Sequence, residues 1–575
     1  MRTVGLAAER ASLSARALGD RPPGSDVLSR RATWALALPV ALVLVGYVLW
    51  PNLATFRLGL DGAVLADLFG RGRAAGTRAL INSVGVSLGT VAGGGVVGVA
   101  LAWALYRFDL PFRRALGAVA ALPLALPPLV GVLAFLFLYG ESGMLPRGLQ
   151  AAFGLEAVPF AFGGITAVLA VHIYVFYVYF FLFASAALAD LDASLLDASA
   201  DLGAGGWTTF RRVVLPLLRP AIVGASLLVF MLSMASFTAP LLFAEGEPFL
   251  TTQIYQFKIN GALDRAAAVS VVLTGLCLLF LIGVEARPQR RGGGAAKGVG
   301  GAPAPLGGAA RVVAGALAAL ALVAVLLPVA TVVLLSFVEE GTWTTQALPD
   351  TFTLDNYVAL ATEPAVWEPI RNSLWMAALA TAANVVFGVV AALVVVKGEV
   401  PGRGALRALA LLPFAVPGTV LALGLVVAFD EASALGGGAV LVGTVWILPL
   451  AYFIRHVPLV VRSTQAALEG TDDRLVEASA DLGATAWTTF RRVVWPAIRP
   501  AVVAGGLLTF VTALGEFVAS ILLYVYENRP ISVEIFSQLR LYEFGQAAAY
   551  SVLLMALVAV AVVASRALGG RGAGV

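Results

Sequence analysis

Long apolar runs separated by short polar segments fill most of the 575-residue chain. A helix needs about 20 predominantly apolar residues to cross the hydrocarbon layer of a bilayer. The pattern predicts twelve such helices, six in each half of the chain. Their expected bounds are 33–50, 79–105, 116–139, 161–187, 220–243 and 267–285, then 312–337, 373–396, 406–429, 437–454, 500–524 and 547–565. We therefore expect an all-α polytopic membrane protein.

Composition and charge agree with this topology. Apolar residues make up 60% of the chain and charged residues only 13%, which is too apolar for an ordinary soluble domain. Cytoplasmic loops of membrane proteins are enriched in Lys and Arg. When the loops are assigned alternately from a cytoplasmic N-terminus, 28 of the 38 basic residues fall inside. The bias predicts that both termini are cytoplasmic, and it explains the net charge without a nucleic-acid partner.

The two halves repeat each other in the same orientation. Residues 197–220 read DASADLGAGGWTTFRRVVLPLLRP and residues 477–500 read EASADLGATAWTTFRRVVWPAIRP, with 18 of 24 positions identical. Shorter landmarks keep the same order: NSVGVSLGT from Asn82 matches NSLWMAALA from Asn372, and LPLALPP from Leu122 matches LPFAVPG from Leu412. Parallel repeats of this kind are related by an axis along the membrane normal.

These observations predict a domain organisation with two permease-like halves. A disordered cytoplasmic tail, 1–32, precedes a first six-helix domain, 33–286, with a polar loop at 193–220. A Gly-, Ala- and Pro-rich linker, 287–311, is expected to be flexible. The second domain, 312–567, has its polar loop at 472–500 and is followed by a short tail, 568–575.

Each polar loop is expected to form a helix–glycine–helix elbow at the cytoplasmic surface. Gly203 and Gly483 follow short acidic helices and suit the left-handed conformation that ends a helix. A solvated loop near lipid phosphates is the simplest alternative. Two nearly identical copies within one chain instead favour a pair of docking helices for a symmetric partner.

The elbows resemble the EAA motif of type I ABC importer permeases. The matching residues are Asp197, Ala198 and Gly203 in the first copy and Glu477, Ala478 and Gly483 in the second. Departures are Asp197 for Glu, Ser199 and Ser479 for the second Ala, and Trp495 for Leu. The resemblance implies the permease fold, two parallel six-helix repeats, and coupling helices that bind a homodimer of ATP-binding cassette ATPase subunits. It also implies an extracytoplasmic solute-binding protein and a location in the cytoplasmic (inner) membrane.

The chain is not expected to hydrolyse ATP itself. A P-loop requires Gly-Lys-Ser/Thr, and none of the three lysines, Lys258, Lys297 and Lys397, stands in that context. No catalytic residue, cofactor or resident metal is predicted. The single cysteine, Cys277, excludes an intrachain disulfide. His172 is better explained by helix packing than by metal binding, since His456, the only other histidine, is expected at the cytoplasmic end of its helix.

Two polar residues are candidates for the translocation pathway. Glu516 falls within the expected span 500–524, and a carboxylate inside a membrane is costly. Ser236 is its equivalent in the first half. The pair would line a path across the pseudo-two-fold axis; a structural hydrogen bond to a neighbouring helix is the alternative for Glu516.

The substrate is suggested only by resemblance. The fused arrangement and the second-half pattern GEFVASILLY…NRPIS are most similar to ferric iron permeases, with thiamine, polyamine and phosphonate permeases as alternatives. The outer loops at 244–266 and 525–546 are weakly similar to those of ferric permeases. An ion-coupled secondary transporter would need more buried titratable residues than Glu516, and a scaffold without transport would not respond to an ATPase.

Overall fold

The computed structural model describes the chain except for residues 1–29, 71–74, 286–302, 344–345, 399 and 569–575. The expected tails and most of the expected linker lie outside the described residues. Within them, no strand forms and the only β features are two isolated bridges. The first half contains α2 (Arg30–Val43), η1 (Leu44–Leu49), α3 (Trp50–Gly59), α4 (Gly62–Phe69), α5 (Ala75–Arg107), α6 (Arg113–Ala120), α7 (Leu122–Ala125), α8 (Pro128–Tyr139), α9 (Met144–Phe153), α10 (Gly164–Ala189), α11 (Ser194–Asp201), α12 (Gly206–Thr209), η2 (Phe210–Val214), α13 (Leu215–Met234), α14 (Thr238–Phe243), α15 (Leu250–Ile259) and α16 (Leu263–Glu285).

The second half repeats this order. It contains α17 (Gly308–Leu335), α18 (Asp355–Thr362), α19 (Pro364–Lys397), α20 (Arg403–Ala415), α21 (Gly418–Phe429), η3 (Ala434–Gly436), α22 (Ile447–Glu469), α23 (Asp473–Asp481), α24 (Ala486–Thr489), η4 (Phe490–Val494), α25 (Trp495–Leu514), α26 (Val518–Leu523), η5 (Tyr526–Asn528), α27 (Ile531–Arg540) and α28 (Phe544–Leu568).

The described helices supply most of the expected membrane spans. Ten are long and apolar enough to cross a bilayer, and the bent pair α20 and α21 makes an eleventh. The expected span 437–454 is displaced: residues 437–446 are not α-helical, and α22 begins at Ile447. This helix is not among the ten, and it carries Arg455, His456 and Arg462 as well as the polar residues Ser463, Thr464, Gln465 and Glu469.

The repeated proline motifs break helices where the sequence predicted continuous spans. Leu126 and Val416, each directly before a proline, have extended ψ angles of 133° and 124°, as expected because a proline ring clashes with a helical preceding residue. The break separates α7 from α8 and bends α21 by 112° relative to α20. The prolines therefore turn the chain inside each half.

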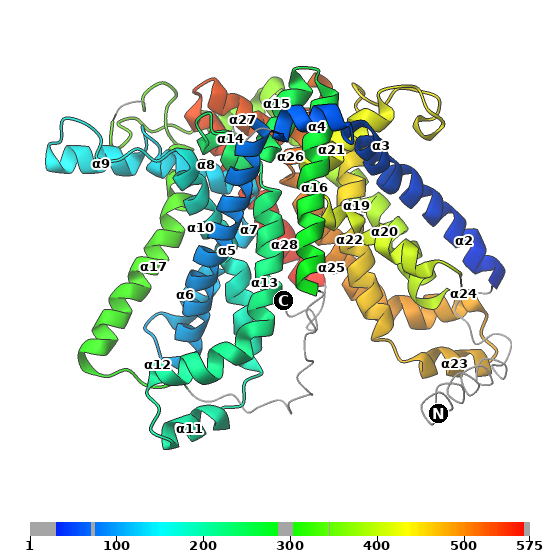
Figure 1. The fold of residues 1–575 in the computed structure, drawn as a ribbon, viewed down its shortest axis with the longest axis horizontal. Coiled ribbons are helices and arrows are strands. Elements are labelled where there is room, and N and C mark those ends of the chain that lie inside the picture. Colours follow the sequence, from blue (N-terminus) through cyan, green and yellow to red (C-terminus); the bar gives the residue numbers. More distant parts are fainter. Residues whose placement is uncertain (1–29, 71–74, 286–302, 344–345, 399, 569–575) are drawn as a thin grey trace.

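The first helix of each half packs against the other half. Helices α2 and α3 lie against α19, α20 and α21, whereas α17 lies against α6 and α8 (Figure 1). A tyrosine hydroxyl forms a hydrogen bond between the halves in each case. Tyr47 donates to the Leu435 carbonyl at 2.6 Å, and Tyr174 donates to the Val325 carbonyl at 2.8 Å. The largest buried core contains residues of both halves. The two halves are therefore interlocked by exchanged helices.

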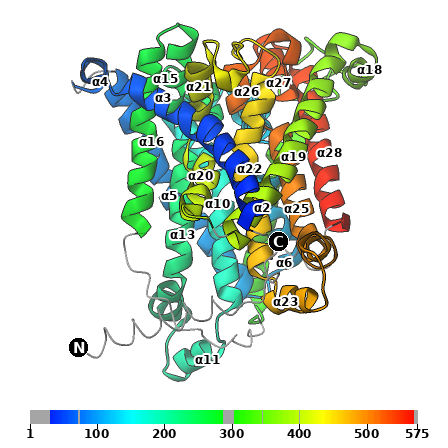
Figure 2. The same ribbon diagram turned by 90° about the vertical axis from the view of Figure 1, so that its right-hand side faces the viewer.

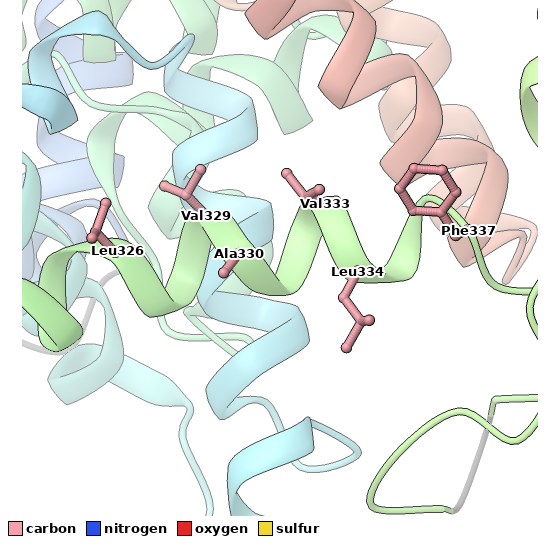
Figure 3. A pocket seen from close by; sticks show the side chains of 6 residues that line it. All are labelled: Leu326, Val329, Ala330, Val333, Leu334 and Phe337. Carbon is pink, nitrogen blue, oxygen red and sulfur yellow. The ribbon is translucent and has the colours of Figure 1, made fainter.

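The molecule has two different ends. The short helices α11 and α23 lie at one end, and α15 and α27 gather at the opposite end (Figures 1 and 2). The segments 244–266 and 525–546, expected as outer loops, contain α15 and α27, which pack on α16 and α28. A groove of about 590 Å³ on α17 is lined only by apolar side chains (Figure 3). Such a surface suits lipid chains and offers no group that would orient a polar solute.

Candidate functional site: two elbows and a buried polar centre

Each elbow forms because an acidic residue begins a helix and a glycine ends it. Asp192 Oδ1 accepts a hydrogen bond from Ser194 N–H, and Asp472 Oδ1 accepts one from Arg474 N–H, both at 3.0 Å. These bonds satisfy N–H groups that lack partners at a helix start. The helices end at Gly203 and Gly483, whose φ angles are +75° and +76°. A left-handed residue reverses the chain here, as the sequence predicted.

A hydroxyl pair closes each elbow. Ser199 Oγ lies 2.9 Å from Thr209 Oγ1, and Ser479 Oγ lies 2.9 Å from Thr489 Oγ1. The bond joins the first short helix of the elbow to the second. The two serines were departures from the EAA pattern, and the structure gives them a common role that alanine would not fill.

The tip of each elbow exposes large apolar side chains. Leu202 and Leu482 are each 88% exposed, and Trp207 and Trp487 are 72% and 69% exposed. Each tryptophan stacks on the phenylalanine three residues later, with 5.7 Å between ring centroids in both copies. Exposed apolar patches of this kind are typical of protein interaction sites.

The six residues that match the EAA motif all lie on the exposed surface of the elbows; they are Asp197, Ala198, Gly203, Glu477, Ala478 and Gly483. Sequence reasoning identified these positions but missed the role of Leu202 and Leu482, the exposed leucines of the ADL sequence in both copies.

The elbow continues into the next span without interruption, so each span begins earlier than the expected starts at residues 220 and 500. The spans run from Gly206 to Met234 and from Ala486 to Leu514. A π-helical turn precedes Pro216 and its equivalent Pro496, and Leu215 N–H bonds the Phe210 carbonyl five residues back. Proline lacks the N–H that would continue the ordinary ladder, and the wider turn accommodates it. Each elbow and the span that follows it therefore form one continuous helical segment.

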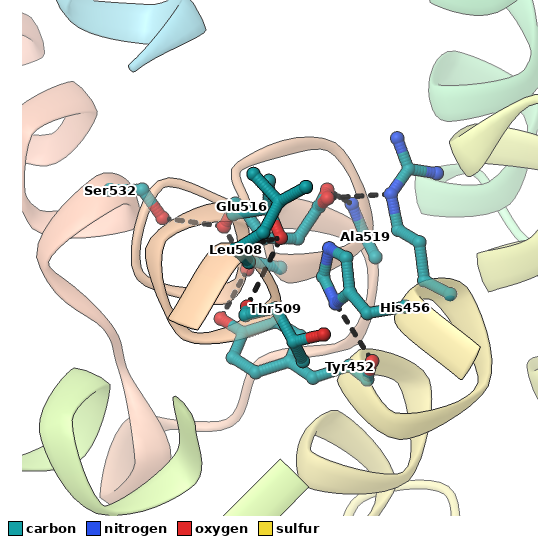
Figure 4. Close-up of polar contacts among 10 residues, drawn as sticks. Tyr452, His456, Leu508, Thr509, Glu516, Ala519 and Ser532 are labelled. Carbon is teal, nitrogen blue, oxygen red and sulfur yellow. Dashed lines mark hydrogen bonds and ion pairs between the residues drawn. The ribbon is translucent and has the colours of Figure 1, made fainter. Parts of the chain in front are cut away.

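Glu516 lies in the break between α25 and α26, and not within a helix as predicted. Its carboxylate is 6% exposed and forms an ion pair with Arg455, with 2.6 Å between Oε2 and Nε (Figure 4). The other oxygen, Oε1, accepts a hydrogen bond from Ala519 N–H at 3.0 Å. The carboxylate is thus neutralised and fixed in place.

Arg455 was missed because it was assigned to a cytoplasmic loop. It lies within α22, and its guanidinium passes over Gly418 at the start of α21: a Cβ at Gly418 would stand 2.1 Å from Nη1. His456 is likewise buried inside α22, where Nδ1 lies 2.8 Å from the Tyr452 carbonyl, and not at a helix end. The sequence signal that could have placed Arg455 in a span is its position directly after the apolar run from Ile447 to Ile454.

Ser236 occupies the equivalent break between α13 and α14. His172 bridges it to α13, with Nε2 at 2.8 Å from Ser236 Oγ and Nδ1 at 3.0 Å from Ser233 Oγ. Both nitrogens therefore have partners, as expected for a packing histidine. The first half has a neutral centre at this position and the second half has an ion pair.

Both breaks are held by the same backbone contacts. Thr251 Oγ1 donates to the Ser236 carbonyl at 2.7 Å, and Ser532 Oγ donates to the Glu516 carbonyl at 2.8 Å. The repeated Asn-Ser landmark also has a role: Ser83 Oγ accepts from Leu250 N–H, and Ser373 Oγ accepts from Ile531 N–H. The landmarks fix α15 and α27, at the end of the molecule opposite the elbows, to α5 and α19.

Phenylalanines directly after the two break residues meet between the halves. Phe237 and Phe517 have ring centroids 6.1 Å apart, and each side chain is 1% exposed. Tyr255 and Phe536 pack on their outer sides at 5.5 and 5.6 Å. The four rings fill the space between the halves beside Ser236 and Glu516. The sequence signal for this pair is a phenylalanine directly after Ser236 and another directly after Glu516, 280 positions later.

Toward the end of the molecule opposite the elbows, Arg529 Nε pairs with Glu534 Oε2 at 2.7 Å. Burial raises the pKa of Glu534, and the Arg529 charge opposes that change. Among the described residues, no group of three or more His, Cys, Asp and Glu side chains is arranged to hold a metal ion.

Known proteins are similar in sequence to most of the chain. The family described as "Binding-protein-dependent transport system inner membrane component" matches residues 94–289 and again 384–571. A probable ABC transporter permease of Sinorhizobium fredii is 31% identical, covering 95% of this chain and 98% of that protein. A ferric transport system permease of Actinobacillus pleuropneumoniae is 27% identical, covering 91% of this chain and 76% of that protein. A sulfate transport system permease of Escherichia coli is 33% identical over 35% of this chain and 75% of that protein.

Two family matches in the same order, one in each half, agree with the two elbows and the two polar breaks. The chain therefore belongs to the family of binding-protein-dependent transport system inner membrane components, and it is an ABC importer permease with both halves fused in one polypeptide.

Proposed function

We propose that this permease imports ferric iron delivered by an extracytoplasmic solute-binding protein. The observation that supports iron is the ferric transport permease of Actinobacillus pleuropneumoniae, which aligns with 91% of the chain and so with both halves. Iron here is cargo passing through the protein. Thiamine, polyamines and phosphonates are the other substrates that the sequence resemblance suggests.

Sulfate is the second candidate substrate. The Escherichia coli sulfate permease matches 35% of the chain at 33% identity. The buried Arg455–Glu516 pair adds no net charge to the space between the halves, so the pair by itself favours neither a cation nor an anion.

The elbows are the proposed contact with a homodimer of ATPase subunits in the cytoplasm. Equal exposure of Leu202 and Leu482, and nearly equal exposure of Trp207 and Trp487, would present two similar surfaces to two identical subunits. In this orientation both termini are cytoplasmic and the protein lies in the inner membrane. The glycines Gly203 and Gly483 would hold each tip in the geometry that the ATPase groove requires.

The proposed pathway runs between the halves past Ser236 and Glu516. The Phe237–Phe517 contact would close its outer end in the conformation described here. Closure of the ATPase dimer would draw the elbows together and favour the conformation in which the rings separate, and hydrolysis would restore the contact. Each ligand acts through a difference in its affinity for the two conformations.

The experiment is uptake into proteoliposomes that contain the chain, the ATPase and the binding protein. Radiolabelled ferric iron, sulfate and thiamine would be compared, each with its binding protein and with or without ATP. ATP-dependent uptake of iron alone supports the proposal. Uptake of sulfate or thiamine in its place would keep the transport class and overturn the substrate.

A further inference from the structure

A cluster of arginines at the elbow end of the first half has no acidic partner. Arg107 ends α5, and Arg113 and Arg114 begin α6. Arg113 and Arg114, with Tyr106, Ser185, Leu188 and Phe181, line a groove of about 350 Å³ between α5, α6 and α10. Within the described part of the chain, none of the three arginines forms an ion pair.

The second half carries two ion pairs on the corresponding surface. Lys397, the counterpart of Arg107, pairs with Asp473. Arg407, one turn along α20 from Arg403, pairs with Glu469 at 2.9 Å between Nη2 and Oε1. Arg403, the counterpart of Arg113, forms no ion pair within the described residues, so carboxylates of the same polypeptide match two of the three basic residues here.

The carboxylates that perform this role are missing from the first half. With the repeat offset of 280, Glu469 corresponds to Ala189 and Asp473 corresponds to Ala193. Asp192 is close by, but its carboxylate caps Ser194 N–H, as Asp472 caps Arg474 N–H in the second half. The capping carboxylates are common to both halves, whereas the two charge-pairing ones are replaced; the first half carries Asp190 at the position of Gly470, and Asp190 forms no ion pair within the described residues.

Two further features of the groove indicate an absent ligand. Arg113 Nε donates to the Leu105 carbonyl at 2.8 Å, which fixes the guanidinium at the rim of the groove. The hydroxyl of Tyr106 is buried and, among the described residues, has no hydrogen-bond partner. A buried polar group without a partner is unfavourable unless a ligand or water completes it.

We propose that this groove binds the phosphate of an acidic phospholipid from the cytoplasmic leaflet. Guanidinium groups form forked, charge-assisted hydrogen bonds with phosphate oxygens, and the Tyr106 hydroxyl would donate a further one. Leu188 and Phe181 are among the residues that line the groove beside the charges, although both are largely buried against the bundle. The phosphate takes the place that Glu469 and Asp473 fill in the second half.

The site adjoins the first elbow, because α10 leads through residues 190–193 into α11. A bound lipid would neutralise positive charge at the base of the first elbow. At the second elbow, carboxylates of the protein itself serve this purpose. The inference depends on the elbows being cytoplasmic, but it requires no particular transport substrate.

The test is native mass spectrometry of the full-length protein titrated with short-chain phosphatidylglycerol, phosphatidylcholine or inorganic phosphate. Ala189→Glu supplies the missing carboxylate and should weaken phosphatidylglycerol binding about fivefold. The double variant R113A/R114A should weaken it about thirtyfold, because each basic residue near an acidic membrane surface contributes about fivefold in affinity. Arg403→Ala, an exposed arginine at the Arg113 position of the second half, should leave the affinity unchanged.

The outcomes separate the possible ligands. Wild-type affinity for phosphatidylglycerol in the Ala189→Glu variant would overturn the proposal, and so would equal binding of phosphatidylcholine. Displacement of the lipid by millimolar inorganic phosphate would assign the site to free phosphate and overturn the lipid assignment. If Ala189→Glu does not fold, Ala193→Asp places the other missing carboxylate and is subject to the same criteria.

Discussion

Replacing Arg455 with alanine would leave the Glu516 carboxylate buried without a counter-charge. The two charged groups are in direct contact, and Glu516 is only 6% exposed. Unit charges about 4 Å apart attract by about 4 kcal/mol at an effective dielectric constant near 20. Removing one partner of a buried pair typically costs about 3–5 kcal/mol because the other charge stays desolvated. We expect Arg455→Ala to destabilise the protein by this amount.

Glu516→Gln provides the contrast. Arg455 is 26% exposed, so its guanidinium retains some access to water when the carboxylate is neutralised. The amide oxygen can still accept from Ala519 N–H. We therefore expect a smaller loss than for Arg455→Ala. The double variant should lose less stability than the sum of the single variants, because each single change already breaks the pair.

The single cysteine provides the assay. Cys277 is 1% exposed, so a thiol-reactive fluorogenic dye should report unfolding of the purified protein in detergent. A loss of 3–5 kcal/mol should lower the apparent melting temperature of a 575-residue chain by about 2–4 °C, because the entropy of unfolding grows with chain length. Melting of Arg455→Ala at the wild-type temperature, or strict additivity in the double variant, would refute the ion-pair reasoning.

Three further changes test the geometry of both sites. Gly418→Ala places a Cβ against the Arg455 guanidinium and should lower the same melting temperature. In a protein that already carries Arg455→Ala, Gly418→Ala should cause little further decrease in melting temperature, and a full further decrease would contradict the contact. Gly483→Ala strains a residue with φ of +76° by about 1–2 kcal/mol and should reduce transport per ATP in proteoliposomes while the protein stays folded; normal coupling would exclude the elbow role. Ser479→Ala removes the bond to Thr489, worth about 1 kcal/mol, and should raise amide hydrogen exchange across 473–489, whereas unchanged exchange would show that the bond does not brace the elbow.

The sequence by itself determined the helical class, the repeat and the elbows. These features depend on local properties: an apolar run long enough to cross a bilayer, and a glycine that reverses the chain after ADL. Gly203 and Gly483 could be identified from the sequence because the left-handed conformation that favours glycine is a local property of the turn. The order of landmarks also predicted a parallel two-fold relation.

Only the tertiary structure decided which groups meet. Arg455 looks like a loop residue until α22 is placed beside the break at Glu516, 61 positions later in the chain. The packing of α2 and α17 against the opposite halves cannot be predicted from the hydrophobic pattern of the sequence, because an apolar helix can pack equally well against either half. The unmatched arginines of the first half were likewise visible as residues, but their lack of partners became apparent only when Asp473 and Glu469 were seen to pair with Lys397 and Arg407 in the other half. Contacts between distant segments depend on the packing of whole helices, and local sequence does not encode that packing.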